Sequence, residues 1–333
     1  MKNTLKYALF YDAQIMNIYK CFFYREIFKK QWTNFKKRVI IKRYENISFV
    51  YIVYNRGRNM KEKYCIPRRE SPYIVAHRGV YGANVPCNTL ASYQTALSHG
   101  ADVIELDVSR SKDGELFVFH PGMERVFLET DKRIPDLTAQ EVKELRLVNY
   151  DHVPTTYPVP TFAEALALLK DKAYINVDKF WTDVEGISKA IKKAGVEKQV
   201  IVKSLIREES LLDYVEKYAS EYMFMAIVRK TDTATPLMQG RNINYIGTEV
   251  LFRQDDEEVI SDEYIRSMHE RGYLVWVNSI LYNERDIIAG DHTDDTALWK
   301  DPDRGWGWLI DKKVDFIQTD WVLALKQYMQ MRK

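Results

Sequence analysis

The sequence contains few cysteines and no long apolar run, and both shortages restrict what the protein can be. Its 333 residues include three cysteines, Cys21, Cys65 and Cys87. Their odd number and wide spacing fit neither a disulfide framework nor a metal site, so we expect a reducing compartment, the cytoplasm. The longest apolar candidate, Ile47–Tyr54, is far shorter than the roughly 20 residues of a membrane-spanning helix. We also expect no signal peptide, because the N-terminus lacks a charged start followed by an apolar core.

Charge is distributed unevenly along the chain, although the formal net charge is only +2. Residues 1–70 hold 17 Lys and Arg against 5 Asp and Glu, a net of +12, whereas the remainder holds 32 against 42, a net of −10. Aromatic residues, among them Phe28 and Trp32, alternate with the basic ones. A basic aromatic helix can lie on an anionic membrane. We therefore predict peripheral membrane contact through residues 1–70; a helix packed on the rest of the chain and a poorly ordered leader remain alternatives.

Three short apolar runs between Tyr73 and His120 end in polar side chains. The first run ends in His77 and Arg78, the second carries Glu105 and Asp107, and the third ends in His120. One such run is common in proteins. Three in close succession predict strands of one sheet that bring their polar ends to one site.

The two carboxylates of the second run are the most informative pair. Side chains alternate along a strand, so Glu105 and Asp107 share one face, about 7 Å apart. Burial of two like charges is costly, and a hard divalent cation with oxygen ligands would offset that cost. From spacing alone, a solvated acidic face on a half-exposed strand is the favoured interpretation. The histidines and Arg78 nearby favour acid-base chemistry beside a metal.

The order of motifs resembles that of the glycerophosphodiester phosphodiesterase family, over about residues 72–325. No single motif is specific, but the ordered series is. The matching segments are His77-Arg78-Gly79, Asn88-Thr89-Leu90, Gly100–Val108, Lys112-Asp113-Gly114, His120, Val159–Leu166, Ile175–Asp178, Val275–Asn278 and Val314–Asp320.

The fold expected for residues 71–333 is an α/β barrel. Strand patterns alternate with helix patterns, which predicts a parallel sheet. The pattern alone also allows an open doubly wound sheet; the family resemblance implies a (β/α)8 TIM barrel. We expect helices that include one at Glu284–Ala289, an extra strand at Leu116–His120, and a connection at Pro121–Pro160 over the mouth. The predicted strands are Tyr73–His77, Val103–Ser109, Tyr174–Asp178, Gln199–Ser204, Met223–Val228, Asn244–Thr248, Leu274–Asn278 and Phe316–Gln318.

The resemblance implies roles for particular residues. The metal ligands would be Glu105, Asp107 and Asp178, where the family usually has Glu in the third position; Mg²⁺ or Ca²⁺ suits such ligands. It implies that His77 and His120 act as general acid and base and that Arg78 holds phosphate oxygens. Two departures are Cys87, which replaces the Glu of Pro-Glu-Asn-Thr, and Pro121, which replaces the Asp after the second His.

A third departure concerns a phosphate-binding lysine. The family's Glu-x-Lys becomes Asp178-Lys179-Phe180, and strand alternation predicts that Lys179 points outward toward the helices. We expect Lys203, at the end of the next strand, to supply the missing cation, and Trp276 to form an apolar wall for glycerol. The alternatives are an exposed strand-end lysine and an ordinary core tryptophan.

The resemblance implies metal-dependent hydrolysis of glycerophosphodiesters to glycerol 3-phosphate and an alcohol, a step of lipid and glycerol metabolism. Two other hypotheses stay open: phospholipase-like cleavage of lysolipids or sphingolipids at a membrane, and a non-catalytic barrel that binds phosphoesters. No nucleic-acid partner is expected, because the sequence carries no nucleic-acid-binding motif.

Overall fold

A computed structural model describes residues 35–44, 47–56, 64–281, 283 and 285–332, and divides the chain into two units, Met1–Glu62 and Lys63–Lys333. In the first unit, strands β1 (Phe35–Tyr44) and β2 (Ile47–Arg56) pair antiparallel as a two-stranded sheet. Most of the predicted membrane-binding segment lies outside the described residues, so that prediction stays a prediction. Among the described residues, no helix is both long and apolar enough to cross a membrane.

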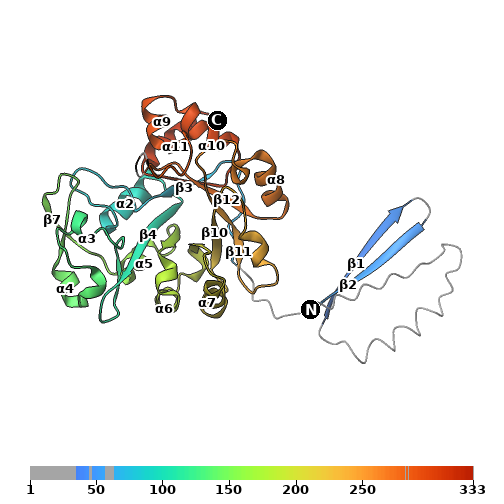
Figure 1. Ribbon diagram of the computed structural model, residues 1–333, viewed down its shortest axis with the longest axis horizontal. Coiled ribbons are helices and arrows are strands. Elements are labelled where there is room, and N and C mark those ends of the chain that lie inside the picture. The colour runs from blue at the N-terminus through green and yellow to red at the C-terminus, as the bar shows by residue number, and fades with distance from the viewer. Residues whose placement is uncertain (1–34, 45–46, 57–63, 282, 284, 333) are drawn as a thin grey trace. The chain divides into compact units, whose positions relative to one another are not determined.

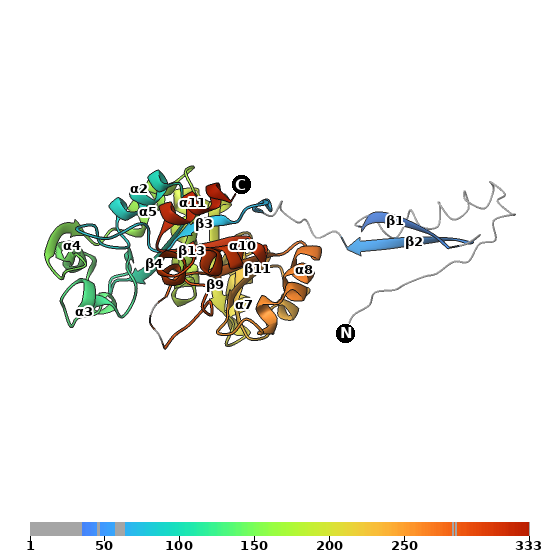
Figure 2. The ribbon, with the colours of Figure 1, turned by 90° about the horizontal axis from the view of Figure 1, so that it is seen from above.

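The second unit is a closed barrel of eight parallel strands, which confirms the predicted fold. The ring closes because β13 pairs with β3 and β3 pairs with β4. Figures 1 and 2 show helices around the outside of these strands. In order around the ring the strands are β3 (Tyr73–Ala76), β4 (Val103–Arg110), β8 (Tyr174–Asp178), β9 (Val200–Leu205), β10 (Met223–Arg229), β11 (Tyr245–Leu251), β12 (Leu274–Asn278) and β13 (Phe316–Thr319).

Several of the helices between the strands begin at side chains that cap them. Thr89 caps α2 and Thr161 caps α5. In each case the threonine hydroxyl oxygen accepts the backbone N–H of the third helical residue, and the side chain of that residue accepts the backbone N–H of the threonine. The longer outer helices are α2 (Leu90–His99), α5 (Phe162–Leu169), α6 (Val184–Ala194), α7 (Ser210–Tyr218), α8 (Asp262–Glu270) and α11 (Val322–Met331). Short 3₁₀ turns lie at Phe180–Thr182, Glu197–Gln199, Thr235–Met238 and Glu258–Ile260.

One predicted helix, Glu284–Ala289, is wrong. The described part, residues 285–289, forms turns, and Ala289 bridges to Phe252. The physical reason is tertiary pairing: the carbonyl oxygen of Ile288 accepts the backbone N–H of Phe252, and the carbonyl oxygen of Phe252 accepts the N–H of Gly290, so this stretch lies alongside Phe252 instead of coiling. The helical segments of this connection come later: α9 (Asp294–Trp299), a π-helical turn at Asp303–Gly307 and α10 (Trp308–Asp311).

The barrel has an inner and an outer apolar core. Inward-facing residues such as Val75, Ile201 and Trp276 fill the interior, while the opposite faces of the strands pack on the helices. The inner cluster includes Ile66, and Arg69 lies 2.8 Å from the carboxylate of Asp102. Residues 64–70, which the sequence analysis placed in the extension, therefore pack on the N-terminal end of the barrel.

The connection after β4 forms a small subdomain beside the mouth. Strand β5 (Leu116–Val118) pairs antiparallel with β4. The subdomain has its own apolar cluster, and its Phe127 and Leu147 line a small cavity together with His120. Figure 1 shows its elements gathered beside β4. They are α3 (Glu124–Phe127), a 3₁₀ turn at Ile134–Asp136, α4 (Ala139–Glu144), β6 (Arg146–Val148) and β7 (Pro154–Pro158).

Candidate active site

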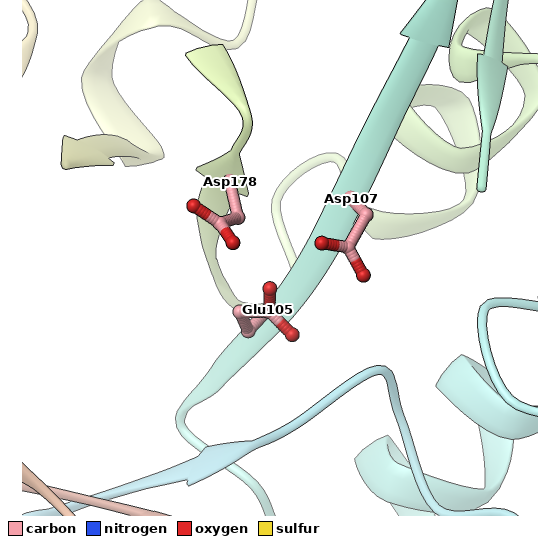
Figure 3. A group of neighbouring side chains, drawn as sticks. All are labelled: Glu105, Asp107 and Asp178. Carbon is pink, nitrogen blue, oxygen red and sulfur yellow. The ribbon is translucent and has the colours of Figure 1, made fainter. Parts of the chain in front are cut away.

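Three carboxylates meet at the C-terminal end of the barrel strands. Asp107 of β4 pairs in register with Asp178 of β8, and Glu105 lies two residues earlier on the same face as Asp107. One carboxylate oxygen from each residue lies within 4.8 Å of the others. Figure 3 shows the three side chains from the two strands turned toward a common space. The structure thus brings together the three residues that the sequence analysis named as ligands.

This acidic cluster, Glu105, Asp107 and Asp178, has the chemistry of a cation site. Oδ1 of Asp107 is buried and accepts no hydrogen bond from any described residue, and such an oxygen is costly to leave without a partner. Two oxygens that bind one calcium ion at about 2.3–2.6 Å can lie up to about 5 Å apart, so the spacing fits. All three donors are carboxylate oxygens, which hard divalent cations prefer.

The two buried carboxylates on β4 have opposite pKa shifts. Burial and the charge of Asp107 raise the pKa of Glu105 to about 7, although His77 opposes the shift. Burial also acts to raise the pKa of Asp107, but Arg78, Lys179, His120 and a hydrogen bond from Asn88 outweigh it and hold that pKa below its usual value. Asp107 is therefore the ionised centre around which the positive groups gather.

Arg78 is fixed by an unusual backbone turn. Its φ is +57°, and its backbone N–H donates to Oε2 of Glu105 over 2.9 Å. Its Nε lies 3.0 Å from Oδ2 of Asp107. The next residue, Gly79, has φ +83°, and a Cβ there would come within 2.5 Å of Ser92. Glycine is required at this position both by its conformation and by its close contact with α2.

His77 follows β3 and is held by a carboxylate from the neighbouring strand. Its Nδ1 lies 2.8 Å from Oδ1 of Asp320, which follows β13. The hydroxyl of Tyr81 donates to the same oxygen over 3.1 Å. A carboxylate at Nδ1 fixes the ring orientation and assigns proton exchange to Nε2.

His120 is oriented without the aspartate that the resemblance would provide. Its Nδ1 lies 2.9 Å from the carbonyl oxygen of Pro121, which can only accept, so Nδ1 carries the proton. Its Nε2 lies 4.0 Å from Oδ1 of Asp107. Burial lowers the pKa of His120, although the charge of Asp107 opposes the shift. The backbone carbonyl thus performs the orienting function that the loss of an Asp at position 121 put in doubt.

The predicted outward direction of Lys179 is wrong. Its Nζ lies 2.6 Å from Oδ2 of Asp178 and 3.6 Å from Oδ1 of Asp107. The reason is local: β8 ends at Asp178, and Lys179 has a left-handed backbone with φ +59°. Strand alternation does not extend through such a residue, so Lys179 turns into the mouth and Phe180 turns into the apolar core, where it is fully buried.

Lys203 lies inside the barrel, as expected, but it is paired. Its Nζ is 3.0 Å from Oε1 of Glu249 and 4.0 Å from the centre of the Trp276 ring. Trp276 has no exposed surface and stacks on Phe316. The Lys203 ammonium thus lies over the face of the indole ring in a cation–π contact.

Sequence reasoning missed the support behind His77. Asp320 ends the matched segment Val314–Asp320, so a carboxylate directly after a predicted strand was an available signal. Behind it, Asp294 accepts the backbone N–H of Asp320 over 2.9 Å. Asp294 also accepts from three side chains, Ser279, Trp306 and Thr319. No sequence pattern marked Asp294, because its helix α9 was not predicted.

Comparison with known proteins gives one consistent result. A sequence model of the glycerophosphoryl diester phosphodiesterase family matches residues 77–321. A glycerophosphodiester phosphodiesterase of Caldanaerobacter subterraneus subsp. tengcongensis is 32% identical over 139 residues, which are 39% of this chain and 57% of the relative. The chain thus spans little more than half the length of that relative.

Solved structures share the fold. A glycerophosphoryl diester phosphodiesterase from Parabacteroides distasonis superposes with a TM-score of 0.67 at 22% identity, over 81% of this chain and 90% of the other. An Oleispira antarctica phosphodiesterase, solved with its product sn-glycerol-3-phosphate, gives a TM-score of 0.58 at 17% identity, over 78% and 97% of the two chains. At these identities the likeness is one of fold.

Proposed function

The chain belongs to the glycerophosphoryl diester phosphodiesterase family, and we propose that it hydrolyses glycerophosphodiesters to glycerol 3-phosphate and an alcohol. The observation that carries the proposal is the acidic cluster flanked by His77, His120 and Arg78, all at the end of the barrel where TIM-barrel enzymes have their active sites. The Oleispira relative was solved with the product that this reaction would release.

We propose that Glu105, Asp107 and Asp178 bind one Mg²⁺ or Ca²⁺ ion. When bound, such an ion neutralises charge on the phosphate and polarises its P–O bonds. A charge count supports the assignment. With all three carboxylates ionised, as metal binding would require, they face two fixed cations, Arg78 and Lys179. A divalent ion would change this excess of one negative charge into one positive charge, which suits a phosphodiester monoanion.

Proton transfer is assigned to the two histidines. One accepts a proton from the water whose oxygen bonds to phosphorus, and the other gives a proton to the alcohol oxygen as its bond to phosphorus breaks. Asp320 holds the ring of His77 and the Pro121 carbonyl holds that of His120, so Nε2 is the exchanging atom in each. These two supports keep both rings in the tautomer that the reaction needs.

Arg78 and Lys179 are the groups proposed to hold the phosphate oxygens. Arg78 contacts Asp107 through Nε, and a guanidinium has further N–H groups that can donate to an oxyanion. The side chain of Lys179 is 21% exposed, so its ammonium can reach a ligand that enters the mouth. Lys179 therefore takes the place that the sequence analysis gave to Lys203.

The direct test is product analysis with purified full-length protein. Glycerophosphocholine with Mg²⁺ or Ca²⁺ should yield glycerol 3-phosphate and choline, and EDTA should stop the reaction. Lysophosphatidylcholine is the matched comparison: its cleavage to lysophosphatidic acid and choline at a higher rate would favour the phospholipase-like hypothesis. No hydrolysis of either substrate with either ion would contradict the proposal and favour a non-catalytic barrel.

We further propose peripheral contact between the N-terminal unit and anionic membranes, based on the net charge of +12 in residues 1–70. Because residues 64–70 pack on the barrel, the segment proposed to bind is 1–62. Full-length protein should sediment with anionic liposomes at low salt and a variant that begins at residue 63 should not. Salt above about 0.1 M should weaken the binding, because exposed charges are screened. Equal sedimentation of both proteins would end this proposal.

A further inference from the structure

The connection between β12 and β13, residues 279–315, carries a buried carboxylate that no step of the proposed mechanism uses. This residue, Asp294, is 2% exposed, and no cation of the described residues pairs with it. Its two oxygens accept hydrogen bonds from four neutral donors instead. Three reach Oδ1, from the hydroxyl of Ser279 over 2.6 Å, the indole N–H of Trp306 over 2.7 Å and the hydroxyl of Thr319 over 2.8 Å. The fourth, the backbone N–H of Asp320, donates to Oδ2 over 2.9 Å.

A charge at this position lowers the stability of the fold. Burial raises the pKa of Asp294 to about 6, the hydrogen bond from Ser279 opposes the shift, and the charge of Asp320 adds to it. A carboxyl group whose pKa is higher in the folded chain costs stability once the pH exceeds its ordinary pKa, and the full cost is reached above about pH 6. A neutral hydroxyl or amide could join the same segments at a lower cost. The carboxylate therefore indicates a role beyond closing the connection.

The hydrogen bonds of Asp294 fix the segment that ends β13 and follows it. Thr319 and Asp320 both donate to Asp294, and the backbone N–H of Trp321 donates to the hydroxyl oxygen of Thr319 over 2.9 Å. Three successive residues are thus held in place. The carboxylate of the middle one, Asp320, lies 2.8 Å from Nδ1 of His77. Asp294 is therefore separated by one residue from the ring to which proton transfer is assigned.

The connection is packed so that Asp294 joins the ends of β12 and β13. The backbone N–H of Asp294 donates to the carbonyl oxygen of Ser279, directly after β12, over 2.6 Å. On the other side, a Cβ at Gly305 would lie only 2.6 Å from the Cβ of Ala297 in α9. A side chain at position 305 would push the π-helical turn away from α9 and withdraw Trp306 from Asp294.

We propose that Asp294 is a positioning residue for His77, and that the connection 279–315 is the rigid support of that histidine. Asp320 determines which ring nitrogen of His77 carries the proton only while its own carboxylate stays in place. Asp294 keeps it in place through the backbone N–H of Asp320. The ring proton then stays on Nδ1, and Nε2 is left to exchange protons with the reacting groups. The catalytic consequence rests on the proposed function, whereas the position of the ring proton can be measured without turnover.

The variant Asp294→Asn is a specific test, because an amide has one acceptor oxygen where a carboxylate has two. We expect the amide oxygen to occupy the place of Oδ1, where three donors converge. The NH₂ group then occupies the place of Oδ2 and faces the backbone N–H of Asp320. Two donors cannot bond to each other, so the contact that holds Asp320 is lost while the shape of the side chain is kept.

The position of the proton on the His77 ring is the first measurement. In full-length protein labelled with ¹⁵N-histidine, NMR correlations between ring nitrogens and carbon-bound ring protons show which nitrogen is protonated, and His77→Ala identifies the His77 signals. At pH 8 an ordinary histidine, with a pKa of about 6.5, is neutral. We expect the proton on Nδ1 in the wild type and its partial or complete transfer to Nε2 in Asp294→Asn.

Steady-state kinetics on glycerophosphocholine are the second measurement. In Asp294→Asn, kcat should fall about tenfold or more, since the hydrogen bond that orients the ring loses its support. KM should stay within about twofold, because the residues proposed to bind the ion and the phosphate are unchanged. A purely structural role would lower the melting temperature but would change neither the ring proton nor kcat per folded molecule.

Two sets of variants serve as controls. Asp315→Asn changes a buried carboxylate that lies 2.9 Å from a different histidine, His269; it should alter the His269 signals and leave those of His77 as in the wild type. Thr319→Val removes one donor to Asp294 and should shift the His77 proton in the same direction even if Asp294→Asn does not fold. Thr319→Ser keeps the hydroxyl and should retain the proton on Nδ1.

The outcomes separate this inference from the proposed function. A folded Asp294→Asn or Thr319→Val variant whose His77 proton stays on Nδ1 would overturn the inference, as would a wild type with the proton on Nε2. A wild type that hydrolyses neither glycerophosphocholine nor lysophosphatidylcholine, but whose His77 proton moves in Asp294→Asn, would instead count against the proposed function and support the positioning role.

Discussion

Buried carboxylates at the two ends of the barrel differ in how many donors surround them. At the N-terminal end, Asp315 has partners of its own: Arg68 at 3.2 Å, His269 at 2.9 Å and the backbone N–H of Val275 at 2.8 Å. At the mouth, three carboxylates crowd within one site. The Asp315 carboxylate is therefore surrounded by hydrogen-bond donors, whereas the carboxylates at the mouth lie next to one another.

This difference indicates that the carboxylate at the N-terminal end stabilises the fold, whereas those at the mouth lower its stability. A carboxylate with charged and backbone donors closes the barrel between the chain before β3 and the strands β12 and β13. A crowded carboxylate pair costs folding free energy, as the raised pKa of Glu105, about 7, indicates. Such a cost persists where a ligand offsets it, which supports the cation proposed at the mouth, whereas the N-terminal end stabilises the fold.

Replacing a histidine at the mouth and one at the N-terminal end should give the largest difference in turnover. Replacing His77 or His120 by Ala should lower turnover of glycerophosphocholine about 10²–10⁴-fold, since each is proposed to move a proton at the reacting atoms. His269→Ala, at the N-terminal end, should lower the melting temperature and leave turnover per folded molecule unchanged. Steady-state kinetics with a melting curve for each variant measure both effects. Near wild-type turnover in either mouth variant would remove that residue from the mechanism.

Replacing a lysine at the mouth and an arginine at the N-terminal end should give a smaller difference, measured in kcat/KM. Lys179→Met should reduce kcat/KM about 10- to 100-fold, because it removes the ammonium that lies beside Asp178 and is proposed to contact the phosphate. Arg69→Met removes a cation from Asp102 at the N-terminal end and should leave kcat/KM unchanged. The two variants are compared on glycerophosphocholine with saturating metal. Equal effects would mean that Lys179 serves only to compensate Asp178.

The smallest expected effect is on the melting temperature. Removing a carboxylate charge should raise it at the mouth and lower it at the N-terminal end. In EDTA at pH 8, Glu105→Gln should raise the melting temperature by a few degrees, since it removes one of two buried like charges. Asp315→Asn should lower it, because His269 and Arg68 lose their charged acceptor. Differential scanning calorimetry measures both. A Glu105→Gln variant less stable than the wild type would show that the mouth is not charge-crowded.

The sequence predicted the barrel because its signals are local and repeated. Each strand is a short apolar run bounded by a helix pattern, and all eight appear close to their predicted bounds. The helix at Glu284–Ala289 failed because the end of this stretch pairs with the backbone of Phe252. Periodicity cannot detect such a tertiary contact.

The predicted side-chain directions were correct where a strand dictates them and wrong where the strand ends. Glu105 and Asp107 share a face by alternation and are found together. Lys179 and Phe180 exchange faces because a single left-handed residue ends β8, and a non-glycine residue in that conformation has no sequence signature. Asp294 and Glu249 contact the mouth through tertiary packing, which no local pattern encodes.

The central claim is that Glu105, Asp107 and Asp178 form one divalent-cation site. Calorimetric titration of the EDTA-treated protein with Mg²⁺ and Ca²⁺ tests it most directly, with Glu105→Gln and Asp178→Asn as variants and Asp315→Asn as the control. We predict one ion per wild-type chain, unchanged binding in Asp315→Asn, and affinity at least about tenfold weaker in both mouth variants, as expected when a charged ligand is removed. Equal affinity in the wild type and the mouth variants would contradict the account.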